Sequence, residues 1–279
     1  MQNQNHKTIH FMAPGGWRFF LVFALLTAYT LFVMWIDDHG VPIKSLAKAD
    51  DTLGISVVMG MIFVFRLNSA YDRWWEGRKL WGQLVNETRN LALKARELAA
   101  PEAQEAAAFA QLLIAFPYAL RDHLRGKTPT ERIPESQRSN FTDVKHVPMA
   151  IAGLVYKQMR GWNKQKLISD IDLQMLDRHA RTYMDVAGAC ERILKSPISK
   201  TIKIVFWLGI LLYSLVTPWI LVPDNHDSTL IMTLLAIYFV LALEFVAQEA
   251  ENPFGTAAND LPLDSICLTI ENSVREVFQ

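Results

Sequence analysis

The sequence has few of the residues that build disulfide frameworks, metal clusters or nucleotide sites. Its two cysteines, Cys190 and Cys267, are not part of a C-x-x-C pair, which excludes a disulfide scaffold and a multi-cysteine metal site. No Walker-type or dinucleotide-type glycine motif occurs, nor does G-x-S-x-G or H-E-x-x-H. His123, His146 and His179 are isolated in the sequence and predict surface or capping roles rather than metal ligands. Nothing therefore predicts an enzyme, a cofactor or a metal ion.

The chain also lacks net charge, because 28 Lys and Arg balance 28 Asp and Glu. This balance argues against a nucleic-acid partner. The charge is uneven along the chain, however. Residues 1–65 carry four basic and four acidic groups, residues 66–203 carry 23 and 15, and residues 204–279 carry one and nine. This asymmetry indicates three regions with different surroundings.

Instead of motifs for chemistry, the sequence has four long apolar stretches, at Trp17–Ile36, Thr52–Phe65, Ile204–Val222 and Ser228–Leu243. A membrane-spanning helix needs about 20 apolar residues. The first and third stretches meet that length, and the fourth does so if Glu244 lies at the interface or faces protein. The second is too short to cross the bilayer in contact with lipid. We expect it to cross while buried inside an assembly.

The remaining sequence favours helices throughout, because apolar residues recur at helical spacing and no β-alternation of any length occurs. We expect an all-α fold, with a four-helix transmembrane bundle that is continued by a cytosolic helical domain. The alternative is a set of core helices in a large soluble protein. A run of 19 uncharged residues at Ile204–Val222 argues against that alternative.

Three apolar side chains of the short second stretch are spaced four residues apart. Val57, Met61 and Phe65 therefore lie on one helix face. If several copies of this helix surround an axis, the three side chains form stacked apolar rings that can dewet and block ions. The alternative is a buried helix that packs them into a core. Asp37 and Asp38 follow the first stretch, where they form either a charged pore mouth or a solvated helix end.

Three segments resemble one known family. Tyr71–Gly82, with the sequence YDRWWEGRKLWG, resembles the bestrophin signature in its bacterial form. Asn252–Gly255 is similar to the second signature of the family, and Ala189–Ile193 resembles the same region of bacterial members. The resemblance extends from Trp17 to Asp264, which is nearly the whole chain.

This resemblance implies a homopentameric channel for monovalent ions, with one central pore across a lipid bilayer. An ungapped alignment on the first signature places the three neck residues of the family at Val57, Met61 and Phe65, which the helical spacing also selects. The second, cytosolic constriction of the family falls on Ile171.

The expected regions follow from the apolar stretches, the basic clusters and the resemblance. The positive-inside rule places the long insert and both termini in the cytoplasm of a multi-pass inner-membrane protein. The regions are 1–65, with an N-terminal tail, two transmembrane helices and the pore-lining segment 53–66; the cytosolic domain 66–203; two transmembrane helices in 204–247; and the cytosolic segment 248–279.

Ion selectivity and gating are less directly encoded. Eukaryotic bestrophins follow the second signature with an acidic run that binds calcium, whereas Asp260 is the one carboxylate in residues 256–260. Calcium needs several carboxylates, so we expect no calcium gating of that kind. Bacterial relatives look more cation-selective, and Asp37 and Asp38 would also favour cations. We therefore expect a cation-leaning channel, with a chloride or other anion channel of the same architecture as the alternative.

Two further classes remain open from the sequence. A secondary transporter would have inverted repeats and two interrupted helices, and neither is visible in the sequence. A membrane-anchored scaffold would use residues 66–203 to bind a soluble partner.

Overall fold

The structure is a computed structural model. It describes residues 17–39, 49–128, 132–133, 141, 144–257 and 259–279, without the side chains of 18, 49–53, 55 and 223–227. The predicted N-terminal tail falls mostly outside these described residues. Within them, the regular backbone is helical and contains no strand, which confirms the all-α class.

Seven α-helices and one short π-helix make up the regular structure of the described residues. They are α1 (Trp17–Asp38), α2 (Ala49–Lys94), the π-helix η1 (Ala95–Ala99), α3 (Ala103–Leu124), α5 (Val147–Lys164), α6 (Asp170–Lys195), α7 (Lys200–Ala250) and α8 (Leu263–Phe278).

The chain divides into two compact units. Unit 1 combines Met1–Asp72 with Ile198–Glu251, and unit 2 combines Arg73–Pro197 with Asn252–Gln279. The first half of α2 belongs to unit 1 and its second half to unit 2.

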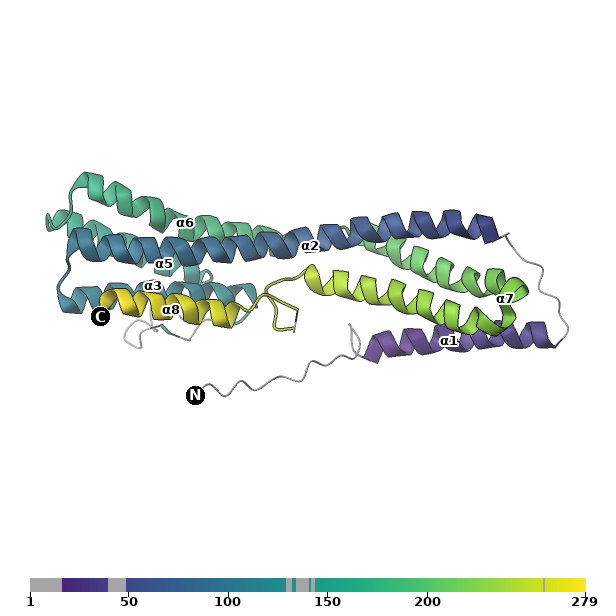
Figure 1. Cartoon of the computed structure of the whole chain (residues 1–279). Coiled ribbons are helices and arrows are strands. Elements are labelled where there is room, and N and C mark those ends of the chain that lie inside the picture. The colour runs from purple at the N-terminus through teal and green to yellow at the C-terminus, as the bar shows by residue number, and fades with distance from the viewer. Residues whose placement is uncertain (1–16, 40–48, 129–131, 134–140, 142–143, 258) are drawn as a thin grey trace. The chain divides into compact units, whose positions relative to one another are not determined.

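Unit 1 contains the helices that are long and apolar enough to cross a membrane. Among the described residues these are Phe19–Asp38 in α1 and two segments of α7, Lys200–Val222 and Ser228–Ala250. The ribbon of α7 folds back on itself between its two segments, and α1 lies along α7 (Figure 1). The third and fourth predicted spans are thus the two arms of α7. The stretch at Thr52–Phe65 is the beginning of the much longer α2.

The core of unit 1 consists mainly of aromatic and aliphatic side chains from all three helices. Phe19 of α1 packs edge-on against Tyr238 and Phe245 of α7. Phe63 of α2 and Ile237 of α7 belong to the same buried cluster. These contacts fix α1 and α2 against the second arm of α7.

A buried ion network joins α2 to α7 inside this apolar unit. Arg66 of α2 is 2% exposed, and its Nε and Nη2 donate to the two carboxylate oxygens of Glu244, which is fully buried, at 3.1 and 3.2 Å. Arg66 also pairs with Glu251, which pairs in turn with Lys203. Gln248 donates to Glu244 at 2.9 Å. Glu244 therefore faces protein, which is one of the two positions that the sequence left open for it.

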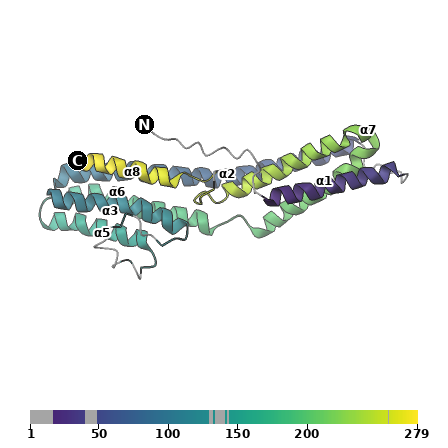
Figure 2. The ribbon, with the colours of Figure 1, turned by 90° about the horizontal axis from the view of Figure 1, so that it is seen from below.

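Unit 2 is a bundle of α3, α5, α6, α8 and the second half of α2. Figure 2 shows α3, α5, α6 and α8 running beside one another. Trp81 and Leu84 of α2, Phe116 of α3, Trp162 of α5 and Tyr183 of α6 are fully buried in one core. Burying large aromatic side chains supplies much of the stabilisation of such a bundle.

A helix stop and restart separates α2 from α3. The π-helix η1 ends at Ala99, and Ala100 adopts a left-handed backbone conformation with φ 38°. Pro101 follows and cannot donate a backbone hydrogen bond, so the chain leaves the helix before α3 begins at Ala103.

The residues that carry the first signature also tie α2 to α6 and to the segment before α8. Arg73 donates to the carbonyl oxygens of Ile193 and Ser196 at 2.5 and 2.6 Å, which caps the end of α6. A Cβ at Gly77 would lie 3.1 Å from the ring of Phe254, which belongs to the second signature. The two signatures are therefore partners in one packing contact.

The helix α8 is attached to α3 by ion pairs. Asp264, in the first turn of α8, accepts hydrogen bonds from Arg121 at 2.7 Å and from Arg125 at 3.0 and 3.2 Å. The hydrogen bonds and charge of Arg125, with the charge of Arg121, hold the pKa of Asp264 below its ordinary value. Glu271, further along α8, accepts a hydrogen bond from the Tyr118 hydroxyl at 2.8 Å.

Replacing Arg66 by Met should destabilise unit 1 strongly, because Glu244 and Glu251 would be left buried without their cationic partner. Breaking a buried pair in this way costs about 3–5 kcal/mol. Chemical unfolding of the purified protein in detergent, followed by tryptophan fluorescence, measures the loss. Arg89→Met is the matched control, because exposed Arg89 makes one hydrogen bond, to Ser273. Equal losses in the two variants would contradict a special role for Arg66.

The attachment of α8 should weaken in acid. Since the pKa of Asp264 is depressed in the folded state, its contribution is present above its unfolded pKa and is lost as pH falls through the folded value. The half-exposed ion pair is worth little, so we expect Asp264→Asn to lower the melting temperature by about 1–3 °C at pH 6. The difference between the two proteins should shrink below about pH 4. A constant difference down to pH 2.5 would contradict this assignment.

Candidate functional site

The first half of α2 has one buried side, which packs on its neighbours in unit 1. Phe63, Arg66 and Ala70 follow one another at spacings of three and four residues, and all are less than 10% exposed. This stripe carries both the apolar and the charged contacts to α7. The stripe thereby fixes the rotation of α2 about its own axis.

The opposite side of α2 is apolar and uncovered within the chain. Val57, Met61 and Phe65 are 61%, 57% and 67% exposed. At 3.6 residues per turn, they lie across the helix from the buried stripe. Because they are uncovered, they do not pack into the core of this chain, as the alternative from the sequence required. The face must border lipid, another subunit or a pore.

The length of the apolar stretch limits these choices. Among the described residues, the helical segments long and apolar enough to span a membrane lie in α1 and α7, and α2 supplies none of them. The apolar part of α2 ends soon after Phe65, because α2 continues four residues later with the more polar sequence Ser69, Ala70, Tyr71 and Asp72. A helix with so short an apolar part is poorly suited to full contact with lipid.

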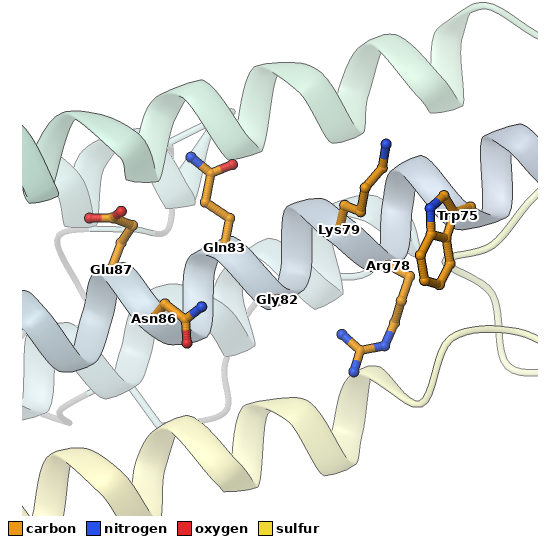
Figure 3. A pocket seen from close by; sticks show the side chains of 7 residues that line it. All are labelled: Trp75, Arg78, Lys79, Gly82, Gln83, Asn86 and Glu87. Carbon is orange, nitrogen blue, oxygen red and sulfur yellow. The ribbon is translucent and has the colours of Figure 1, made fainter.

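The second half of α2 lines an open pocket in unit 2 with basic and amide side chains. The pocket has a volume of about 550 Å³. Figure 3 shows Lys79 and Gln83 projecting from α2 toward one neighbouring helix, and Arg78 projecting toward the other side. Within the described part of the chain, Arg78 and Lys79 form no ion pair with a carboxylate. The pocket is lined by Trp75, Arg78, Lys79, Gly82, Gln83, Asn86 and Glu87.

Ile171 lies in the first turn of α6, in unit 2. It is 70% exposed, and the turn is fixed by a capping box in which Ser169 and Asp172 bond each other's backbone. The capped first turn thus presents the large apolar side chain of Ile171 on the surface of the chain. The neck residues belong to unit 1, so the chain alone does not join the two predicted constrictions in one site.

Asp37 and Asp38 form the last two positions of α1. Asp37 is half-buried and Asp38 is exposed. Carboxylates are unfavourable at the negative end of a helix, and the last turn of α1 contains no basic residue. The pair therefore places two carboxylates at this end of unit 1.

The segment after the second signature is a tight turn held by its own acidic residue. Asp260 accepts a hydrogen bond from the Ala257 backbone at 2.6 Å. A Cβ at Gly255 would approach a carboxylate oxygen of Asp260 to 2.5 Å, so a larger residue here would displace that carboxylate. Trp74 donates its indole N–H to the carbonyl of Asn259 at 3.1 Å. In this chain the segment has a packing role.

The structure brings together two histidines that the sequence left apart. His123 and His146 both contact one oxygen of Glu191, and the three ligand atoms lie within 4.8 Å of one another. His146 also caps α5, as its side chain accepts a hydrogen bond from the Met149 backbone. No motif spacing could reveal this group, because its members lie 23 and 45 residues apart along the chain.

Comparisons with known proteins bear on this arrangement. The chain matches the family model described as "Bacterial/Fungal Bestrophin protein" over residues 18–276. It is 35% identical, over 90% of its length and 84% of the relative, to a protein of Synechocystis named "voltage-dependent anion channel-forming protein". It is 31% identical to a protein of Escherichia coli with the same kind of name, over 91% of this chain and 83% of that one.

The fold is also that of solved structures. A crystal structure of a bacterial bestrophin homologue from Klebsiella pneumoniae superposes with a TM-score of 0.84 at 24% identity, covering 93% of this chain and 98% of that one. A second, titled as a membrane protein, gives 0.87 with the same identity and coverage.

The exposed face of α2 can be tested by cysteine labelling. The natural thiols give a low background, since Cys190 and Cys267 are buried and burial raises the pKa of each to about 12. If the face borders water, a charged, membrane-impermeant thiol reagent should modify Met61→Cys in the reconstituted protein. Leu25→Cys is the control, because Leu25 is equally uncovered but lies in a candidate span of α1. Labelling of Leu25→Cys without Met61→Cys would contradict the assignment.

Proposed function

This chain belongs to the bacterial and fungal bestrophin family, and on that premise we propose that it is a homopentameric ion channel with one central pore. Five copies of α2 surround the axis, and the side that α7 leaves uncovered faces it. The observation that supports this arrangement best is the apolar face at Val57, Met61 and Phe65, which needs a cover that the single chain does not provide. The apolar part of α2 is too short to cross the bilayer in contact with lipid. When several copies of α2 pack around an axis, they avoid that contact.

Three apolar rings would form the neck of this pore. A narrow apolar ring excludes water and so imposes the cost of ion dehydration, without any plug. Met61 is the most adaptable of the three, because its unbranched side chain has several rotatable bonds. We assign the resting block to these rings, and opening to their widening. Calcium has no part in this gating, in keeping with the single carboxylate at Asp260.

We assign anions as the permeant class. The comparisons favour this alternative over the cation preference that Asp37 and Asp38 suggested, because several relatives above 30% identity carry the name of anion channels. Charge in unit 2 supports the choice. Residues 66–203 have 23 basic and 15 acidic groups, and Arg78 and Lys79 border an open pocket. A basic vestibule raises the local anion concentration.

Other parts of the chain take roles at the ends of the pore. Ile171 forms a second apolar constriction on the cytosolic side, and its rigid, capped turn suits a ring of fixed diameter. Asp37 and Asp38 lie at the outer end, where they oppose anion entry and so reduce conductance. The protein lies in the inner membrane with both termini in the cytoplasm, residues 66–203 and 248–279 are cytosolic, and residues 204–247 span the bilayer.

Reversal potential tests the ion class directly. The purified protein is reconstituted in planar bilayers with a tenfold gradient of KCl. An anion channel gives a reversal potential close to the chloride equilibrium potential, and a cation channel gives one of opposite sign close to that of potassium. The second result would restore the cation preference while leaving the channel assignment intact.

Conductance tests the neck. Met61→Ala should raise single-channel conductance or open probability several-fold, because it widens one apolar ring and lowers the dehydration cost. Leu212→Ala is the matched control, since Leu212 is an exposed apolar residue of a candidate span in α7. We expect it to conduct like the wild type. An unchanged Met61→Ala channel would count against the neck.

A further inference from the structure

A second candidate site lies in unit 2, and none of its three residues comes from α2. His123 comes from the last turn of α3, His146 directly precedes α5, and Glu191 comes from the last turns of α6. Nε2 of His123 lies 3.0 Å from Oε1 of Glu191, and Nε2 of His146 lies 2.7 Å from the same atom. Three helices that share a core thus also meet at one carboxylate oxygen.

The three ligand atoms have the type and spacing of a zinc site with one open position. Two imidazole nitrogens and one carboxylate oxygen form a donor set that zinc binds in tetrahedral geometry. Ligand atoms about 2.1 Å from a tetrahedral zinc lie about 3.4 Å from one another. The observed distances of 2.7 and 3.0 Å need to increase by about 0.4 to 0.7 Å. Side-chain rotation supplies that, because the three side chains are 17–26% exposed.

The surroundings keep the carboxylate in place. Lys195 donates to the other oxygen, Oε2, at 2.7 Å and leaves Oε1 for the site. A ligating carboxylate is commonly oriented by such an outer partner.

Hydrogen bonding at the second nitrogen of His146 sets a cost for metal binding. Nδ1 of His146 accepts a hydrogen bond from the Met149 N–H at 3.1 Å, so Nε2 carries the proton of the neutral ring and donates to Glu191. When a metal binds Nε2, the proton of the neutral ring must lie on Nδ1. Nδ1 can then no longer accept the hydrogen bond from the Met149 N–H. Metal binding therefore exchanges one capping hydrogen bond at α5 for metal bonds that join α3, α5 and α6.

His179, a buried histidine of unit 2, does not suit metal binding. His179 lies between Glu87, at 2.5 Å from Nδ1, and the ammonium group of Lys94, at 2.7 Å from Nε2. A cation at that nitrogen would be repelled by Lys94. At the group of His123, His146 and Glu191, the ammonium of Lys195 bonds Oε2 of Glu191 and not one of the three ligand atoms.

We propose that His123, His146 and Glu191 form a binding site for a divalent transition metal of the zinc class. The bound ion links the ends of α3 and α6 to the start of α5 and leaves one coordination position for water. The site is independent of the pore, and it makes the stability of unit 2 dependent on metal.

The test uses the full-length oligomer in detergent, stripped with a chelator, and Zn²⁺ as the probe. Isothermal titration should give one Zn²⁺ per chain with a Kd in the micromolar range or below, and Zn²⁺ should raise the melting temperature. Glu191→Gln, which keeps an oxygen to accept the imidazole N–H groups, should weaken binding at least tenfold, as should His123→Asn. His39→Asn is the matched control, because His39 is exposed in the turn after α1. It should leave binding unchanged.

A second measurement removes the dependence on variants. Zinc-edge X-ray absorption of the wild-type complex should show two imidazole ligands. The proposal is overturned if the stripped protein binds no zinc, if binding survives Glu191→Gln and His123→Asn, or if the absorption spectrum shows oxygen ligands alone.

Discussion

The ion network around Arg66 decides which side of α2 is available to other molecules. The Arg66 guanidinium is 2% exposed and bonds the fully buried carboxylate of Glu244. This pair holds its orientation, because separating the two groups would leave each charge buried without a partner. The rotation of α2 in unit 1 follows from this pair. The stripe of Phe63, Arg66 and Ala70 must face α7, and the apolar residues opposite must face outward.

From this constraint the proposed assembly follows by elimination. An uncovered apolar face on a helix whose apolar part is too short for lipid needs other copies of the chain, and symmetric oligomers are the usual way to provide them. The two arms of α7 and the helix α1 have the length to meet lipid. In unit 2, Arg73 and Gly77 hold α2 against the end of α6 and against Phe254, so the second half of the same helix is equally constrained.

The sequence predicted the helical class, the long apolar segments of α1 and α7, and the spacing that puts Val57, Met61 and Phe65 on one helix face, because each depends on local spacing. For Glu244 in an apolar stretch, the sequence left two possibilities, a position at the membrane interface or a protein partner. The identity of that partner, Arg66, could not be predicted, because the two residues are 178 positions apart and pairing depends on how α7 folds back. The same limit applies to His123, His146 and Glu191, which looked unrelated along the chain. Ile171 was placed by resemblance alone, and its exposure agrees with a role at a surface without assigning one. The selectivity prediction rested on the resemblance to bacterial relatives and on Asp37 and Asp38, whereas the names of the matched relatives favour anions.

The central claim is that Val57, Met61 and Phe65 of several subunits face one shared axis. Electron cryomicroscopy of the purified protein in lipid nanodiscs tests it most directly. The account predicts five copies of α2 around a central axis, with these three side chains pointing toward it at the narrowest part. A map in which they point toward the lipid, or in which the protein is monomeric, would contradict it.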